Sequence, residues 1–286
     1  MAYSAEISRN NPSCFLFVID QSGSMSDSYP DIGKSKAQAL SEVINKMLQE
    51  LVLKCAKGDS DNPMGIRNYF YVGVIGYGGN GVSFSLGGQH HGKDLVSISD
   101  IANFPLRIEE RMKKLSDNAG GFVEVNVKFP IWFDPTASGG TPMKAAFEKV
   151  NTVIDKWLQQ NPNCFPPVVI HITDGESTDG EPIEEMNKLK AKSSSDGNVV
   201  LFNLHTHARS PISITMPGSD TALPDQYAQM LFDGASTLPD IFKKVAKNDF
   251  GMSLKEDAKA FLLNGAYEVI ITALEIGTRA SLQLMR

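Results

Sequence analysis

The residues best suited to chemistry in this 286-residue chain form an Asp-x-Ser-x-Ser motif, made of Asp20, Ser22 and Ser24. The motif directly follows the apolar run 15–19, which has the composition of a buried strand. One carboxylate and two hydroxyls place hard oxygen donors on a single loop. Such donors suit Mg²⁺, Mn²⁺ or Ca²⁺, and none of them favours zinc. The motif therefore predicts a loop that binds a divalent cation rather than a loop that carries a nucleophile.

Two later segments bear related residues. Thr141 follows a Gly-Gly pair and precedes Pro142, and Asp174 ends the apolar run 168–173. Each has an ordinary explanation by itself, because threonine is a good helix N-cap and Asp-Gly is a common turn. In a parallel α/β sheet, however, ligands bind beyond the carboxyl ends of the strands. Such a fold would bring Asp20, Thr141 and Asp174 to one edge.

Hydrophobic periodicity predicts strands that alternate with helices. We expect strands at 14–20, 69–77, 82–86, 122–129, 168–173 and 199–205, with a hairpin turn at 78–81. We expect helices at 34–57, 141–160, 183–191, 225–232, 238–247, 253–264 and 266–279. The segment 87–105 has the composition of a loop. The segment 107–116 suits either a helix or the hairpin partner of 122–129, and the pattern does not decide between them.

This order of elements predicts an α/β fold with a doubly wound, mostly parallel central sheet and helices on both faces. We expect a single domain over 1–286. Its core would cover about 13–86 and 136–205, and an inserted β-hairpin and loop region would cover about 87–135. A C-terminal helical part would cover about 225–280.

The three motifs, in this order, resemble those of the von Willebrand factor A (VWA) domain, whose metal-ion-dependent adhesion site uses the same segments. The resemblance covers most of 14–205 and the helices up to about 280. It implies a Rossmann-like VWA fold with Mg²⁺ as the cofactor and Mn²⁺ or Ca²⁺ as alternatives. The metal-site residues implied by the resemblance are Asp20, Ser22, Ser24, Thr141 and Asp174.

The resemblance also implies a function and a partner. The chain would be a non-catalytic, divalent-metal-dependent protein–protein interaction module, and a partner protein would supply an Asp or Glu to the metal. The adhesive members of the family are extracellular, whereas residues 1–11 here are polar and show no secretion signal. The chain is therefore more similar to the bacterial-type intracellular members. Those members are associated with ATPases and with kinase–phosphatase pairs, which implies a cytoplasmic partner of that kind.

Composition points the same way. The net charge of −6 argues against a nucleic-acid partner and against an anionic membrane surface. The three cysteines form no CxxC pair, which favours reduced thiols in a cytoplasmic protein. The longest apolar stretches, near 15–19 and 268–276, are too short to span a bilayer.

Two enzyme-like alternatives fit the motifs less well. Gly33-Lys34-Ser35 resembles the end of a phosphate-binding loop, but Ser28 stands where the first glycine is needed. Asp20 resembles a strand-end aspartyl nucleophile, but Ser22 stands where such phosphatases need a second acid. No enzyme activity is therefore expected. A structural domain with a non-functional metal site is the remaining alternative.

Other candidate residues have simpler explanations. The acidic run from Asp174 to Glu185 lacks the glycine of an EF-hand loop and favours a solvated face. The five histidines show no metal-ligand spacing, so we expect core or surface roles for them. Phe129 and Trp132, at the end of the expected strand 122–133, are predicted to pack on the core rather than to border the metal site.

Overall fold

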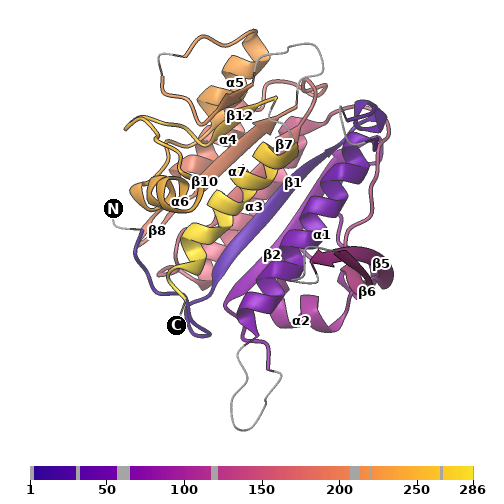
Figure 1. Ribbon diagram of the computed structural model, residues 1–286. Coiled ribbons are helices and arrows are strands. Elements are labelled where there is room, and N and C mark those ends of the chain that lie inside the picture. Colours follow the sequence, from indigo (N-terminus) through magenta and orange to yellow (C-terminus); the bar gives the residue numbers. More distant parts are fainter. Residues whose placement is uncertain are drawn as a thin grey trace.

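The structure, a computed structural model, describes residues 3–29, 33–56, 65–116, 122–206, 213–219, 221–264 and 267–285 (Figure 1). The end of the expected helix 34–57 and His207, one of the five histidines, lie outside the described residues.

A largely parallel sheet forms the centre of the molecule. Its strands lie side by side in the order β11-β12-β10-β7-β1-β2-β3, and β4 pairs with the other end of β2. β1, β2, β7, β10 and β12 are parallel, whereas β3, β4 and β11 run antiparallel to their neighbours. The bounds are β1 Ser13–Gln21, β2 Phe70–Gly78, β3 Gly81–Phe84, β4 Val96–Ser97, β7 Val168–Thr173, β10 Val200–His205, β11 Ile214–Thr215 and β12 Phe261–Leu263.

Helices cover both faces of this sheet, and each face has its own apolar cluster (Figure 1). β1 shows why: Phe15, Phe17 and Ile19 point to one cluster, and Leu16 and Val18 point to the other. A strand buried on both faces has to be apolar throughout. The first face carries α1 Lys36–Cys55, α2 Ile98–Asn103, α6 Asp240–Phe250 and α7 Tyr267–Leu282. The second carries α3 Met143–Gln160, α4 Ile183–Ala191 and α5 Gln226–Gly234.

The strand order reverses beside β1. The chain leaves β1, passes through α1 and returns to pair on one side as β2, whereas the later β7 pairs with β1 on the other side. The loops after β1 and β7 therefore lead from the carboxyl edge to opposite faces of the sheet. This is the place in an open α/β sheet where ligands bind.

The insertion between β3 and α3 contains a separate hairpin, made of β5 Arg107–Ser116 and β6 Phe122–Ile131. Of the two possibilities for 107–116, the strand is therefore correct. Alternation along the hairpin is clear, but neither face is fully covered, since Ile108, Met112 and Val123 are all exposed. Trp132, just beyond β6, is buried as expected, and Phe129 is half-buried.

Two local expectations are wrong. The segment 253–264 forms no helix in the structure; its end is β12, which pairs in parallel with β10. Ser253 and Glu256 have the spacing of a capping box, which favours a helix. The apolar residues that follow them are buried in the sheet, and this burial outweighs the local helix signal. The expected loop at 87–105 contains the short helices η2 Gly88–His90 and α2, and Ser97 caps α2 by accepting from the amide of Asp100.

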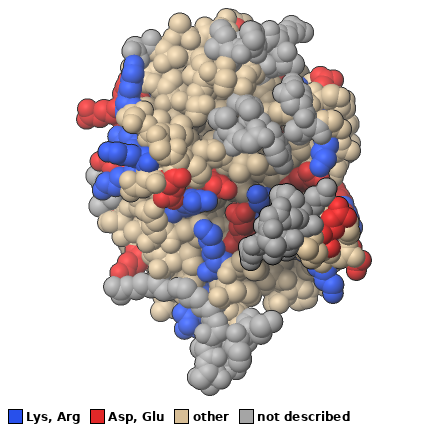
Figure 2. All heavy atoms as spheres, viewed as in Figure 1, with Lys and Arg blue, Asp and Glu red and all other residues tan. Residues whose placement is uncertain are grey.

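The architecture is thus a mixed α/β fold with a largely parallel central sheet. The three cysteines are buried, and none of them forms a disulfide within the part of the chain that the structure describes. No helix among the described residues is both long and apolar enough to cross a membrane. On the face shown in Figure 2, acidic and basic side chains are interspersed.

Candidate functional site

The loop after β1 holds Asp20 from two sides. The backbone amide of Ser22 donates to Asp20 Oδ1 at 2.8 Å, and the Thr173 hydroxyl donates to Asp20 Oδ2 at 2.6 Å. Burial raises the pKa of Asp20, while the hydrogen bonds from Ser22 and Thr173 act in the opposite direction. β1 and β7 are adjacent parallel strands, so their last side chains meet at the carboxyl edge.

A second carboxylate, Asp174, completes a polar cluster at this edge. Ser24 Oγ donates to Asp174 Oδ1 at 2.7 Å, and the hydroxyls of Ser22 and Ser24 lie 3.1 Å apart. The short helix η1 Gly23–Ser26 turns the chain directly after β1, with Ser22 at its N-cap position. Four of the residues expected at the site are therefore connected through direct contacts, with Thr173 on the neighbouring strand also bonded to Asp20.

Thr141 joins the cluster from the loop before α3. Its hydroxyl lies beside the loop after β7, since a Cβ placed on Gly175 would be 3.6 Å from Thr141 Oγ1. Its backbone is held by Thr178, whose hydroxyl accepts from the Thr141 amide at 3.0 Å and whose amide donates to the Thr141 carbonyl at 2.9 Å. All five expected site residues thus gather at one edge.

The expected role of Thr141 as the N-cap of α3 is wrong. The helix begins at Met143, and the residue at the N-cap position is Pro142. The cap comes instead from Asp179, whose two carboxylate oxygens accept from the amides of Lys144 at 3.0 Å and Ala145 at 2.9 Å. Because Asp179 occupies these amides, the Thr141 hydroxyl does not need to cap the helix. Asp179 belongs to the acidic run that we expected to be only solvated.

Sequence reasoning missed the most consequential member of the cluster, Lys36. Its ammonium lies 2.6 Å from Asp174 Oδ2, and the two side chains are 7% and 0% exposed. The ammonium is therefore an internal counter-charge for Asp174. One signal was available: Lys36 is the first residue of α1, where the helix dipole disfavours a cation, so a nearby carboxylate was to be expected.

Backbone contacts fix the loop 138–141 across the ends of β1 and β2. The amide of Gly23 donates to the Gly139 carbonyl, and the amide of Ser138 donates to the carbonyl of Gln21. Gly139 has a φ of +66°, and a Cβ there would lie 2.2 Å from the Cα of Gly79. Glycine is required at 139, because a side chain would separate the two loops.

A buried polar chain lies under the site. The Tyr77 hydroxyl is 2.7 Å from His171 Nε2, and His171 Nδ1 is 3.0 Å from Asn203 Oδ1. Burial lowers the pKa of His171 to about 4, so the imidazole is neutral near pH 7. Tyr77 is also the register partner of Asp20. This histidine therefore has a structural role beneath the site, as expected for a core histidine.

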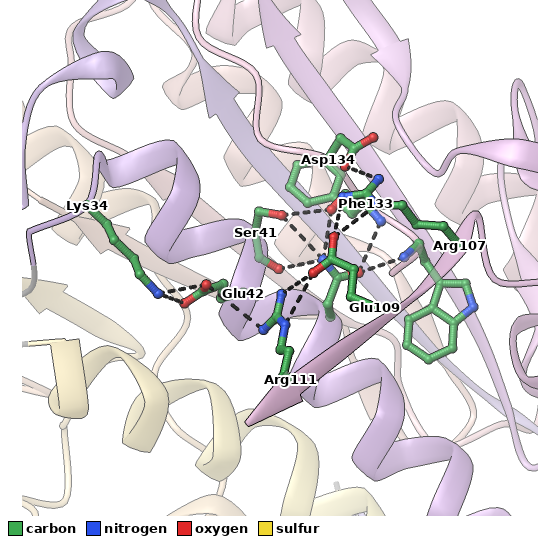
Figure 3. Close-up of polar contacts among 10 residues, drawn as sticks. Lys34, Ser41, Glu42, Arg107, Glu109, Arg111, Phe133 and Asp134 are labelled. Carbon is green, nitrogen blue, oxygen red and sulfur yellow. Dashed lines mark hydrogen bonds and ion pairs between the residues drawn. The ribbon is translucent and has the colours of Figure 1, made fainter. Parts of the chain in front are cut away.

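A charged ladder anchors the insertion to α1 on the same side of the sheet (Figure 3). Its charges alternate in sign through a series of ion pairs. In order, these join Lys34 to Glu42, Glu42 to Arg111, Arg111 to Glu109, Glu109 to Arg107, and Arg107 to Asp134. Beneath it, Asn45 Oδ1 accepts from the amides of Trp132 and Phe133. The ladder fixes the start of the segment that leads to Thr141.

A cleft adjoins the cluster on the β2–β3 side. Its volume is about 240 Å³, and it lies between the β2–β3 hairpin and the segment 134–138. Gln21, the residue after Asp20, lines it together with polar residues of the hairpin. The candidate site is therefore a polar cluster with an open cleft beside it.

The chain was compared with family models, curated protein sequences and solved structures. A scan of family models finds no match, and a search of curated protein sequences finds none either. Among solved structures, the chain is similar to the pilus adhesin SpaC from Lactobacillus rhamnosus GG. The match has a TM-score of 0.50 and 12% identity, and it covers 96% of this chain and 32% of that one. The chain thus spans about a third of the adhesin's length.

Two further structures are similar to a lesser degree. A variant of the PilB minor pilin from Streptococcus sanguinis matches at a TM-score of 0.48 and 10% identity, covering 96% of this chain and 62% of that one. The pilus adhesin RrgA from Streptococcus pneumoniae matches at 0.29 and 15% identity, covering 61% of this chain and 22% of that one. These two similarities are too low to support an argument.

These findings correct several expectations. The assignment to the bacterial-type intracellular VWA group is wrong, since the solved structure that the chain resembles at a TM-score of 0.50 is a pilus adhesin. The cytoplasmic location and the function as an intracellular metal-dependent interaction module are wrong for the same reason. The expectation of an intact metal-ion-dependent adhesion site is also corrected. Among the described residues, no group of three or more His, Cys, Asp or Glu side chains could hold a metal.

Proposed function

We propose that this chain is a ligand-binding domain of a surface-adhesion or pilus protein. The observation that carries the proposal is the cluster of hydroxyls and carboxylates at the carboxyl edge, placed where the strand order reverses. The similarity to a pilus adhesin suggests the cell-surface setting. Ligand binding would use this edge through Ser24, which is exposed, whereas Ser22 and Thr141 are buried behind it. As a further part of the proposal, we take the sheet to be doubly wound about β1.

The domain is proposed to be non-catalytic. Its two carboxylates accept hydrogen bonds or pair with Lys36. The Ser22 hydroxyl forms a hydrogen bond with the Ser24 hydroxyl rather than with a base. A protein partner that offers an Asp or Glu, and the absence of nucleic-acid and membrane partners, stay predictions.

A divalent cation at this edge is a separate proposal, because its donors would be two carboxylates and three hydroxyls rather than a group of three or more His, Cys, Asp or Glu side chains. The donor chemistry fits Mg²⁺, because carboxylate and hydroxyl oxygens are the ligands it prefers. Asp20, Ser22, Ser24, Thr141 and Asp174 would hold the ion, which would supply a positive centre at the edge. Lys36 would oppose loading, since its ammonium already contacts Asp174.

Ion loading is tested by titrating purified protein with MgCl₂ and following heat release and melting temperature, with EDTA as the reverse step. Mg²⁺ should raise the melting temperature, and Asp20→Asn should remove the effect. A melting temperature that does not respond to MgCl₂ or EDTA would exclude the cation.

The cell-surface role is tested by antibody labelling of intact and permeabilised producing cells. Labelling of intact cells is expected, whereas labelling only after permeabilisation would overturn the proposal. Adhesion by cells that carry Ser24→Ala should fall relative to the wild type. Ser26→Ala is the matched control, because Ser26 lies in the same turn but, among the described residues, its hydroxyl donates to the Gly23 carbonyl rather than to the cluster.

A further inference from the structure

The cleft beside the cluster has a composition unlike that of the rest of the site. Polar side chains that line it include Gln21, Asn80, Ser83, Ser85 and Ser138. Asp134 is the only Asp, Glu, Lys or Arg side chain among the lining residues, and Arg107 pairs with it at 2.7 Å. His91 also lines the cleft, but no Lys or Arg does, so a phosphate or another strong anion would find no permanently charged basic group there. A cation would meet a carboxylate that is already paired.

The polar groups of the cleft are free to bind a ligand. Within the described part of the chain, the side chains of Gln21, Asn80 and Ser138 make no hydrogen bond to protein. The hydroxyl oxygens of Ser83 and Ser85 are 3.5 Å apart, which is at most a weak hydrogen bond. The cleft therefore offers several uncharged groups that can donate and accept, and each is exposed or half-buried.

Glycine gives these groups their arrangement. A Cβ on Gly76 would lie 2.2 Å from Gln21 Oε1 and 2.4 Å from Ser85 Oγ. The Gln21 amide and the Ser85 hydroxyl thus meet over a bare backbone, on the face of the strands opposite Tyr77. Any side chain at 76 would displace them. Leu86 and Leu106 add an apolar wall.

Asp134 joins the cleft to the charged ladder. Its Oδ1 accepts from Arg107, which is held in turn by Glu109 (Figure 3). The ladder fixes this carboxylate in position at the cleft. Amides, hydroxyls and one fixed carboxylate next to an apolar wall match a ligand that combines many hydroxyls with a C–H face.

We propose that this cleft binds a neutral carbohydrate unit, and that it is the part of the adhesive surface that selects the ligand. Each sugar hydroxyl both donates and accepts, as the lining hydroxyls and amides do. The volume of about 240 Å³ admits a small ligand rather than a folded partner. The inference rests on the proposed function, because it names the ligand class of the adhesion domain.

The test uses the purified chain on an array of immobilised oligosaccharides that end in galactose, glucose, mannose or N-acetylglucosamine. Sialylated versions and extended peptides are printed beside them. Neutral sugars should bind, and Asn80→Ala and Asp134→Asn should each weaken binding at least tenfold. The matched control is Asn10→Ala, because Asn10 lines a cavity of about 400 Å³ formed by other segments, and it should change nothing.

Other outcomes separate the possibilities. Arg107→Met keeps the Asp134 carboxylate, so binding that survives this variant but not Asp134→Asn assigns the contact to the carboxylate itself. Binding to peptides alone, preference for sialylated sugars, or sugar binding unaffected by both cleft variants would overturn the inference. Surface labelling of intact cells is measured independently, so a wrong ligand class can be distinguished from a wrong cell-surface role.

Discussion

Two sets of charges anchor α1 to its surroundings, and they differ in exposure. Lys36 and Asp174 form one buried pair, 7% and 0% exposed, inside the site. The ladder from Lys34 to Asp134 is a series of pairs whose side chains are 33–48% exposed (Figure 3). Solvent screens the ladder, so its pairs are each worth little. The buried pair has lost its hydration, and removing one partner leaves an uncompensated charge. A single buried contact at the site therefore matters more than several contacts around it.

The largest expected effect comes from breaking the buried pair. Lys36→Met should lower the free energy of unfolding by about 3 kcal/mol, because it leaves Asp174 buried without its counter-charge. Urea unfolding measures the change. The double variant Lys36→Met/Asp174→Asn should cost less than the two single changes added together. Lys34→Met is the matched control from the exposed ladder and should cost less than about 1 kcal/mol. Equal losses in the two lysine variants would contradict the comparison.

A pH dependence is expected from the buried histidine beneath the site. The pKa of His171 is about 4 in the folded chain and near 6.5 when unfolded, so the unfolded chain binds more protons between these values. The free energy of unfolding is then highest above pH 6.5 and falls by up to about 3 kcal/mol as the pH drops toward 4. Urea unfolding of wild type and His171→Gln at pH 7.5 and 4.5 measures this. Identical pH dependence in both proteins would show that the imidazole is not held neutral.

A smaller effect is expected at the α3 cap. Asp179→Ala removes the acceptor for the amides of Lys144 and Ala145 and should cost about 1 kcal/mol. Thr141→Ala should cost less, because Thr141 does not cap the helix. Thermal unfolding of the two variants compares them directly. A larger loss of stability in Thr141→Ala than in Asp179→Ala would indicate that Thr141 caps the helix after all.

The smallest effect belongs to the ladder itself. Arg107→Met should lower stability by less than about 1 kcal/mol, and the difference should vanish in 1 M NaCl, where charges are screened within about 3 Å. Unfolding at low and high salt gives the measurement. A loss that persists at high salt would mean that Arg107 acts through packing.

Much of the fold was open to sequence reasoning. Strands β1, β7 and β10 are apolar runs, and α3 and α4 show clear periodicity, so local pattern and tertiary burial agree. The pattern failed at β12, a three-residue strand that exists only because β10 lies beside it. A strand of three residues is too short to show an alternating hydrophobic pattern in the sequence.

The candidate site divides in the same way. Asp20, Ser22 and Ser24 could be recognised from the sequence alone, since their chemistry lies within five consecutive residues. The sequence also determined that Thr141 follows a Gly-Gly pair and that Asp174 follows a strand, which brings both residues to the same edge. Only the tertiary structure decided that Lys36 neutralises Asp174 and that Asp179 replaces Thr141 as the cap. Both contacts join segments more than thirty residues apart, and their partners are chosen by distance in the folded chain rather than by spacing along it.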